Sequence, residues 1–327
     1  MRCLIRALAA GAMLLGSIAA AQGQAPSASS GQAYPSRPIH LILPFAGGTD
    51  AVARLLAFKL SPALGQPILP EQRLGAGGNI AHRAVAAAAP DGYTLLMAAP
   101  PFVINPHLNP LAGFDPLRDF VPIATLTAIA NVLVVQPKVP AKSLSELVEL
   151  ARSRPGKLSY GSGGVGSTNQ LAAELLKSMA KIDLLHVPYK SATLALTGLL
   201  AGEVDIVIVA ASSVAAYAKD GRVRPLAVLD AKRSSAMPEV PTSVEAGMPI
   251  VAVNWYVLLA PAGTPREIVV RLNSEAQRAM HASDLRDRLE AIGGEPVSAS
   301  PEDTAAFLGK EYEQWGKVIR EAGIKAE

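Results

Sequence analysis

The segment Leu158–Gln170, LSYGSGGVGSTNQ, places a glycine-rich turn between a strand-like run and a helix. The run is Leu158 to Tyr160, and apolar periodicity predicts the helix from Leu171 to Ala180. Glycine lets the backbone turn tightly, and the first amides of a helix have no partner within the helix. These amides and the helix dipole attract a carboxylate or phosphate without needing a lysine or arginine. The segment therefore predicts an α/β unit with an anion-binding turn.

Two other interpretations of this turn stay open. Gly161, Gly163 and Gly166 match the GxGxxG pattern of dinucleotide sites. That pattern also needs an acidic residue at the end of the next strand, about 20 residues on. Asp183 precedes the next strand-like run, Leu184–Tyr189, and no acidic residue closes that run. A glycine turn with only a packing role is the third interpretation. We favour the small-anion site.

The N-terminal residues differ from the rest of the chain. Arg2 and Arg6 precede an uncharged apolar run, Ala7–Ala21, that ends in small residues. The run is short for a membrane span, so we predict a signal peptide over residues 1–21, cleaved near Ala21. A polar, flexible linker is expected over residues 22–33. The mature protein is therefore predicted to be exported.

The composition predicts an ordered globular protein. Half of the residues are hydrophobic and 17% are charged. A chain of 327 residues is long enough for two domains with separate cores. The single cysteine, Cys3, lies in the predicted signal, so we expect no disulfide, thiol catalyst or cysteine metal site in the mature chain. Without the signal, 28 basic residues balance 27 acidic ones, which gives no indication of nucleic acid binding. No further apolar run reaches membrane length.

The beginning of the mature chain predicts strand, glycine turn and helix twice. The strand Ile39–Leu43 leads into the turn PFAGGT (44–49) and a helix from Asp50 to Leu64. The second unit is predicted as a strand at Ile68–Glu71 and a helix at Asn79–Ala89. A third strand, Tyr93–Ala98, is predicted to follow it. Such alternation predicts a parallel sheet with right-handed crossovers, whose ligands lie at the carboxyl ends of the strands.

A second α/β unit follows a nearly uncharged run, Ile123–Val135, which is expected to cross between lobes. Asn254–Ala260 is expected to cross back. The elements predicted between them are a helix capped by Ser143 and Glu146, a helix at Ala192–Ala201, a helix at Ser212–Lys219, and strands at Leu158–Tyr160, Leu184–Tyr189, Val204–Val209 and Val223–Leu229. Two crossings imply a hinge with a cleft between lobe 1 (34–130 and 253–327) and lobe 2 (131–252).

Helix caps and polar residues near the crossings carry further predictions. Thr264 is expected to cap the long helix that follows the return crossing, and Ser300 with Asp303 to cap the last helix. Asp50 either caps its own helix or touches a ligand through water, and we favour the cap, with Arg54 one turn on as a partner. Trp255 and Tyr256 serve either as cleft wall or as hinge packing.

The residues indicate no catalytic or metal site. The five histidines, His40, His82, His107, His186 and His281, show no metal-binding spacing. His186 is expected to be satisfied by the backbone. SxxK at residues 178–181 lacks its partner motifs, and neither GxSxG nor a triad pattern is present. We therefore expect no catalysis, no metal and no cofactor.

The chain from Tyr34 to Lys325 resembles one family throughout. The matching stretches, in order, include YPSRPIHLILPF, GGTDAVARLLA, GAGGN, PDGYTLL, DPLRDFVPIA, GKLSYGSGGVGS, HVPYK, LLAGEVD, AMPEVPTSVEAGMP, LLAPAGTP and EYEQWGKVIREAGIK. They are similar to those of the Bug receptors, the periplasmic solute-binding proteins of tripartite tricarboxylate transporters. The resemblance implies a monomeric two-lobed α/β binding protein of type II, the Venus flytrap fold. It also implies that main-chain amides of two glycine turns, and ordered water, hold a ligand carboxylate.

Site residues follow from this resemblance position by position. The implied ligand-binding residues are Phe45, Ala46, Gly47, Gly48, Thr49 and Asp50 in the first turn, Ser162, Gly163, Gly166, Ser167 and Thr168 in the second, Tyr189, Lys190 and Ser191 beside it, and Val209 and Ala210 at a third strand end. Four positions depart from the family pattern. The first turn is two residues shorter than PFxPGGGTD, Gln170 replaces a common histidine, Ser191 and Ala192 replace glycines, and Val209 and Ala210 replace an acidic or amide pair.

The last departure bears on the ligand. A buried ammonium group needs a carboxylate or several acceptors, and the side chains of Val209 and Ala210 offer neither. We therefore expect a mono- or dicarboxylate without an amino group, with an apolar, aromatic or plain aliphatic body, that is passed to membrane subunits of a transporter. Two alternatives are an exported enzyme that binds a nucleotide at the GxGxxG turn, and a binding subunit for another importer or a sensor.

Overall fold

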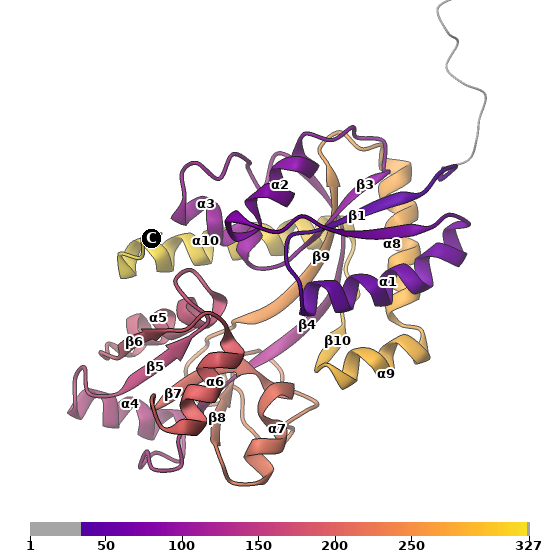
Figure 1. Ribbon diagram of the computed structural model, residues 1–327. Helices are drawn as coiled ribbons and strands as arrows, with labels where there is room; N and C mark the ends of the chain where they lie inside the picture. The colour runs from indigo at the N-terminus through magenta and orange to yellow at the C-terminus, as the bar shows by residue number, and fades with distance from the viewer. Residues whose placement is uncertain (1–33, 326–327) are drawn as a thin grey trace, which may run out of the picture. The chain divides into compact units, whose positions relative to one another are not determined.

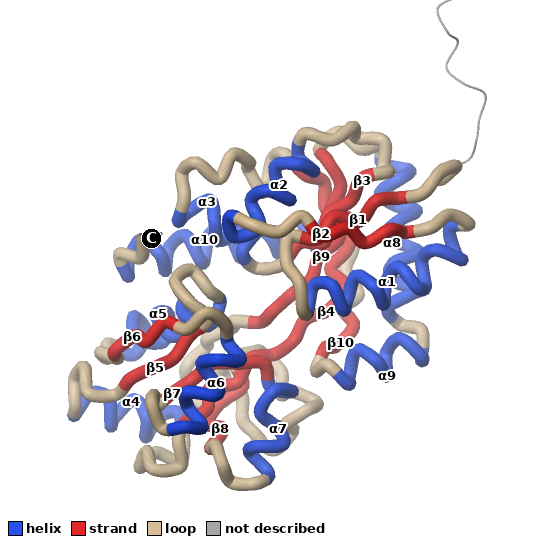
Figure 2. Tube along the Cα trace, viewed as in Figure 1, coloured by secondary structure: helices blue, strands red, loops and turns tan. Residues whose placement is uncertain are grey.

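The computed structural model describes residues 34–325, which form a mixed α/β fold with one ten-stranded sheet (Figures 1 and 2). The strands are β1 (Ile39–Leu43), β2 (Ile68–Gln72), β3 (Thr94–Ala98), β4 (Phe120–Val135), β5 (Ser159–Ser162), β6 (Leu185–Pro188), β7 (Ile206–Ala210), β8 (Arg224–Val228), β9 (Val253–Pro261) and β10 (Gly294–Pro296). The helices are α1 (Gly48–Leu64), a 3-10 turn at Ala76–Gly78, α2 (Asn79–Ala86), α3 (Pro101–Leu108), α4 (Leu144–Ser153), α5 (Thr168–Ala180), α6 (Ala192–Ala201), α7 (Ala211–Lys219), α8 (Arg266–Met280), α9 (Ser283–Ala291) and α10 (Pro301–Ala322). The predicted signal peptide and linker lie outside the described residues.

Two groups of parallel strands share the long strand β4. The strand order is β2-β1-β3-β9-β4-β7-β5-β6, with β8 and β10 also paired to β4. The part of β4 from Phe120 to Ala130 pairs with β9, and the part from Asn131 to Val135 pairs with β7 and β8. Lobe 1 therefore comprises β1, β2, β3, β9 and β10 with their helices, and lobe 2 comprises β5 to β8 with theirs. The nearly uncharged run that predicted a crossing strand forms β4.

Strand directions make the carboxyl ends of the two groups face each other. Strand β3 is antiparallel to β9, which is antiparallel to β4, so β3 runs along β4 toward lobe 2. Strand β7 is antiparallel to β4 and runs toward lobe 1. The last residue of β3, Ala98, pairs with Val257 of β9, which pairs in turn with Thr125 of β4. The last residue of β7, Ala210, pairs with Asn131 of β4. At about 3.3 Å per residue, the two ends are separated by about 20 Å along β4.

Alternation along β9 divides the core of lobe 1. Tyr256 and Leu258 pack with α1 and α8, whereas Trp255 and Val257 belong to the cluster on the other face, with α10. The buried carboxylate of Glu311 on α10 accepts hydrogen bonds from the indole nitrogens of Trp255 (2.7 Å) and Trp315 (2.9 Å). Burial raises the pKa of Glu311. Because α10 also packs on α5 of lobe 2, this cluster is shared by both lobes.

Local sequence signals place most helix starts correctly. Ser143 accepts from the Glu146 amide at the start of α4, and Ser300 and Asp303 form a full capping box on α10. The predicted cap at Thr264 is wrong. Helix α8 begins after Pro265 without a side-chain cap, and the Thr264 hydroxyl donates to the Pro261 carbonyl (2.8 Å). Helices α3 and α9 and strand β10 are absent from the sequence predictions.

Among the described residues, no helix combines the length and the apolar character that a membrane span requires.

Candidate functional site

The first glycine turn, residues 44–50, joins β1 to α1 and leaves the start of that helix uncapped. Gly47 is the N-cap residue, with φ of 73°, and no side chain accepts from the first amides of α1. Ala46, Gly47 and Gly48 are exposed, and the ring of Phe45 lies against Gly78. An uncapped helix start of this kind offers several backbone donors and a positive dipole end to an anion. The turn can therefore bind a carboxylate through main-chain atoms.

Two hydroxyl groups lie beside this helix start without partners. Thr49 is 3% exposed and Tyr256 is 8% exposed. Neither hydroxyl makes a hydrogen bond to another residue in the range 34–325. A Cβ atom built on Gly48 would lie only 2.3 Å from the Tyr256 hydroxyl oxygen, so that oxygen lies directly against the first residue of α1. Neither hydroxyl oxygen is among the fully buried unpartnered atoms of the described residues, so both reach solvent and are available to a ligand.

Asp50 does not cap α1, contrary to the interpretation favoured from sequence. Its carboxylate accepts from Arg54 (2.7 and 3.1 Å) and from the Gln72 amide (3.1 Å). The hydrogen bond from Arg54 is the main reason that the pKa of Asp50 is lowered. Arg54 is thus the partner that the spacing predicted. The pair holds the acidic side chain at the edge of the turn, where it offers no cap to the helix.

The second glycine turn, residues 161–168, joins β5 to α5 and is satisfied by its own side chains. Ser162 is fully buried, bonds His186 Nε2 (2.7 Å) and accepts from the Gly164 amide (3.1 Å). Ser167 caps α5 and donates to the Gly164 carbonyl (2.7 Å). Gln170 accepts from the Gly166 amide (2.7 Å), so the residue that replaces a histidine holds the turn. The side chains of Ser162, Ser167 and Gln170 are therefore committed within lobe 2, whereas the Thr168 hydroxyl makes no hydrogen bond to another described residue.

Residues beside the second turn support its shape. Gly163 packs against the start of α6, because a Cβ atom there would lie 3.1 Å from the Ala192 amide nitrogen. Ser191 caps α6. The Tyr189 hydroxyl donates to Glu203 (2.9 Å), and Lys190 is exposed. Thr168 is buried at the first position of α5.

The end of β7 offers no side-chain charge. Val209 is buried and Ala210 is half-buried. Ala210 pairs with Asn131, whose amide nitrogen donates to the Ala252 carbonyl (2.7 Å) and whose oxygen accepts from Asn254 (3.0 Å). Register and alternation put Ala210, Asn131, Asn254 and Tyr256 on one face of the sheet, between the facing strand ends. These side chains form a neutral floor below the two turns.

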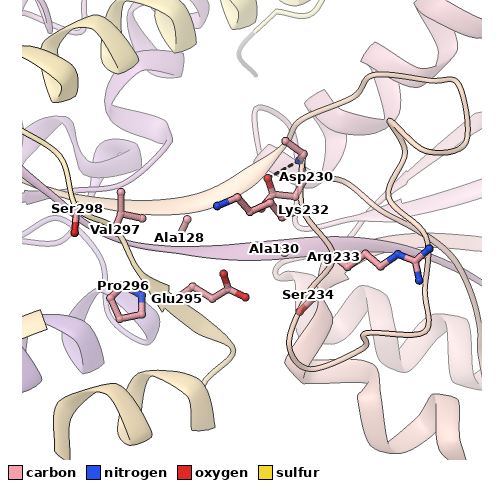
Figure 3. Close-up of a pocket in the computed structure, with 11 residues that line it drawn as sticks. Ala128, Ala130, Asp230, Lys232, Arg233, Ser234, Glu295, Pro296, Val297 and Ser298 are labelled. Atoms are coloured by element: carbon pink, nitrogen blue, oxygen red, sulfur yellow. Dashed lines mark hydrogen bonds between the residues drawn. The ribbon is translucent and has the colours of Figure 1, made fainter. Parts of the chain in front are cut away.

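A separate cavity lies on the opposite face of β4, and none of the predicted site residues lines it. Its volume is about 370 Å³, and Ala128 and Ala130 lie between its two sides (Figure 3). The loop after β8, with Asp230 and Lys232, lies on one side, and β10, with Glu295, on the other (Figure 3). Burial, followed by the nearby Glu295 carboxylate, raises the pKa of Asp230. The cavity is thus lined by groups of both charges, Asp230 and Glu295 with Lys232 and Arg233.

Sequence reasoning left Tyr256 undecided and missed the two asparagines of the floor. Trp255 and Tyr256 are consecutive residues of β9, so their side chains lie on opposite faces of the sheet. Its contact with Gly48 links segments far apart in the chain, and no local pattern reports such a contact. Asn131 and Asn254 are polar residues within two apolar crossing strands, a signal that could have identified them.

These features define the class of protein. A mixed sheet with two parallel groups, joined by two crossing strands, and with facing strand ends, is the two-lobed α/β fold of type II solute-binding proteins. Comparison with known proteins agrees. The model of the tripartite tricarboxylate transporter family receptor matches residues 52–324. The chain belongs to this receptor family, which confirms the resemblance carried by its motifs.

Individual relatives share most of the chain. BugT of Bordetella pertussis is 36% identical over 90% of this chain and 92% of its own length, and a protein encoded between tcbD and tcbE in a Pseudomonas species is 38% identical over 90% and 89%. A Rhodopseudomonas palustris protein solved with adipate is 36% identical, with a TM-score of 0.76 over 90% of this chain and 99% of that one. MatC of the same organism, solved with malate, is 34% identical, with a TM-score of 0.72 over 88% and 100%.

Proposed function

We propose that this protein is an exported, periplasmic receptor that binds a small carboxylate without an amino group and delivers it to the membrane subunits of a tripartite tricarboxylate-type transporter. The observation that carries the proposal is the uncapped start of α1 at an end of the lobe 1 sheet that faces lobe 2. The relatives solved with adipate and malate support a dicarboxylate. We expect the receptor to act as a monomer.

The two turns contribute differently to binding in this proposal. The first turn supplies the amides of Gly48 and Thr49 and the dipole of α1, worth about 0.3 to 2 kcal/mol plus charge-assisted hydrogen bonds. The second turn supplies backbone groups near Gly163, the start of α5 and the Thr168 hydroxyl, because the hydroxyls of Ser162 and Ser167 are already bonded. Closure of the lobes excludes water from the ligand and strengthens each of these interactions.

The floor between the turns argues against amino acids as ligands. Asn254 offers one neutral oxygen, and Val209 and Ala210 offer no side-chain acceptor. The neutral oxygens of Asn254, Thr49 and Tyr256 include no carboxylate, and without one they compensate poorly for the desolvation of a buried ammonium group. A ligand with carboxylate groups and an aliphatic or aromatic body leaves no such group unpaired.

A ligand panel tests this function on the mature protein. We expect adipate, malate or a related carboxylate to raise the melting temperature, because a ligand at a hundred times its dissociation constant adds about 2.7 kcal/mol of stability. Calorimetric titration then ranks the affinities. Tighter binding of aspartate or glutamate than of every non-amino carboxylate would refute the ligand class. Binding of ATP or NAD with no carboxylate bound would instead support a nucleotide site at the second turn.

A further inference from the structure

Tyr256 lies at the point where the first turn meets the hinge. It is on β9, the lobe 1 strand by which the chain returns from lobe 2, and it pairs with Thr127 of β4. Along β4, Thr127 lies between Thr125, which marks the end of β3, and Asn131, which pairs with the end of β7. The Tyr256 side chain therefore lies between the facing strand ends, on the same face of the sheet as Asn131 and Asn254. Its hydroxyl contacts Gly48, the first residue of α1.

The hydroxyl of Tyr256 differs from those of one other buried tyrosine, Tyr160, and two half-buried ones, Tyr34 and Tyr189. Tyr34 donates to the Gly92 carbonyl (2.7 Å), Tyr160 to Glu174 (2.6 Å) and Tyr189 to Glu203 (2.9 Å). Tyr256 is 8% exposed and has no hydrogen-bond partner within residues 34–325. The hydroxyl oxygen is not one of the fully buried unpartnered atoms of the described residues, so it reaches solvent beside the start of α1 and is open to a ligand.

The protonation state of this hydroxyl suits one role. Burial raises the pKa of Tyr256 to about 12. The group is therefore neutral across the physiological range, and it can donate a proton in a hydrogen bond to an anion. The neighbouring amides of the α1 start are donors as well. Donors without partners therefore converge on one side of Gly48 from two elements of the fold.

We infer that the Tyr256 hydroxyl is a ligand-binding group, which donates a hydrogen bond to the same carboxylate that the uncapped start of α1 receives. This inference rests on the proposed function and adds to it a side chain on the hinge. Tyr256 holds the ligand oxygen from β9, the lobe 1 strand by which the chain returns from lobe 2. Tyr256 thus selects an ionised carboxylate over an amide or ester, since a neutral acceptor makes a weaker bond to the same donor.

The substitution Tyr256→Phe tests the inference, since it removes only the hydroxyl. The matched control is Tyr217→Phe on α7, where the ring is half-buried and packs with Arg222, away from the two turns. We expect Tyr256→Phe to weaken binding of the best carboxylate of the panel by about 10- to 100-fold, as loss of a hydrogen bond to a charged group does. Tyr217→Phe should bind as the unaltered protein does.

Stability of the unliganded protein separates binding from a structural role. Because the hydroxyl has no partner in the free protein, Tyr256→Phe should unfold at the same denaturant concentration or a higher one. Equal affinity of Tyr256→Phe and the unaltered protein would overturn the inference and leave the proposed function standing. Weaker binding with an equal loss of unliganded stability would also overturn it, since the residue would then be structural. Failure of the unaltered protein to bind any carboxylate would overturn both proposals.

Discussion

The two glycine turns look alike in sequence but differ in how their polar groups are satisfied. In the first turn, the start of α1 is uncapped and the hydroxyls of Thr49 and Tyr256 have no partners among the described residues. In the second, Ser162, Ser167 and Gln170 bond the turn itself or its neighbours. The difference indicates that the first turn provides unpaired donors for a ligand, whereas the second is a rigid support that presents backbone groups.

This difference has an energetic reason. The hydroxyls of Thr49 and Tyr256 contribute no hydrogen bond within the free protein, whereas those of Ser162 and Ser167 are bonded within the fold. Substitutions in the first turn should therefore reduce binding and spare stability. Substitutions in the second turn should reduce stability and have a smaller effect on binding. The predictions below test this separation.

The largest effect is expected from Gly48→Ala. The added Cβ would lie 2.3 Å from the Tyr256 hydroxyl oxygen, which is closer than real contacts allow, so the tyrosine or the turn must shift. Both donor groups are then misplaced, and we expect affinity for the best carboxylate to fall by more than about 100-fold, or about 2.7 kcal/mol. Isothermal titration calorimetry measures the change.

Gly309→Ala is the matched control, because Gly309 lies within α10 and a Cβ there meets nothing within 4 Å. That variant should bind normally and gain about 0.5 to 1 kcal/mol of stability from its better helix propensity. If Gly48→Ala binds within a fewfold of the unaltered protein, the first turn is not the main binding element.

A smaller effect, on stability, is expected from Ser162→Ala. The substitution removes the bond to His186 and the acceptor of the Gly164 amide from a fully buried site. We expect unfolding free energy to fall by about 1 to 3 kcal/mol, while affinity changes by less than about threefold. Urea unfolding and calorimetry measure the two quantities on the same samples.

The corresponding variant of the first turn is Thr49→Val, which removes an unpartnered hydroxyl and preserves the shape of the side chain. Its stability should be unchanged or higher, and its affinity about five- to tenfold lower, as loss of about 1 kcal/mol of hydrogen bonding implies. Loss of affinity in Ser162→Ala and loss of stability in Thr49→Val would reverse the roles assigned to the two turns.

Sequence signals identified the fold and both turns, since these depend on local patterns. Alternating strands and helices, the capping Ser143 and Ser300, and the glycines of 44–50 and 161–168 are each visible within a few residues. Helix α3 was missed because Pro100, Pro101 and Pro106 suggest a loop, although proline is well tolerated at the first helical position.

The part of the site that could not be predicted depends on contacts between distant segments. Local patterns predicted the Arg54 partner of Asp50, but not that Gln72 also bonds Asp50, that Gln170 bonds the Gly166 amide, or that Tyr256 reaches Gly48. Which polar group keeps a free hydrogen bond is a property of the packed chain. The difference between the two turns therefore appears only in three dimensions.

The smallest effect is expected from pH. With its pKa raised to about 12, Tyr256 keeps its proton in the folded protein well above pH 9, and a carboxylate ligand is ionised throughout the neutral range. The raised value also fixes the sign for stability. The contribution of Tyr256 is fully present below pH 10, the unfolded value, and is lost as pH rises toward about 12. We expect affinity to change by less than about twofold between pH 6.5 and 9, measured by calorimetry in buffers of equal ionic strength.

A pH-dependent affinity would indicate that the second turn, and not the first, determines how tightly the ligand binds. Ser162 bonds His186 there, and histidine is the side chain that changes charge near neutral pH. A fall or rise of affinity by tenfold across this range, retained in Tyr256→Phe but abolished by His186→Gln, would show that lobe 2 controls recognition. A flat profile in the unaltered protein, with a uniform loss in Tyr256→Phe at each pH, would show that binding depends on donors that do not titrate. That outcome is what the unpaired hydroxyls and the uncapped helix of the first turn require.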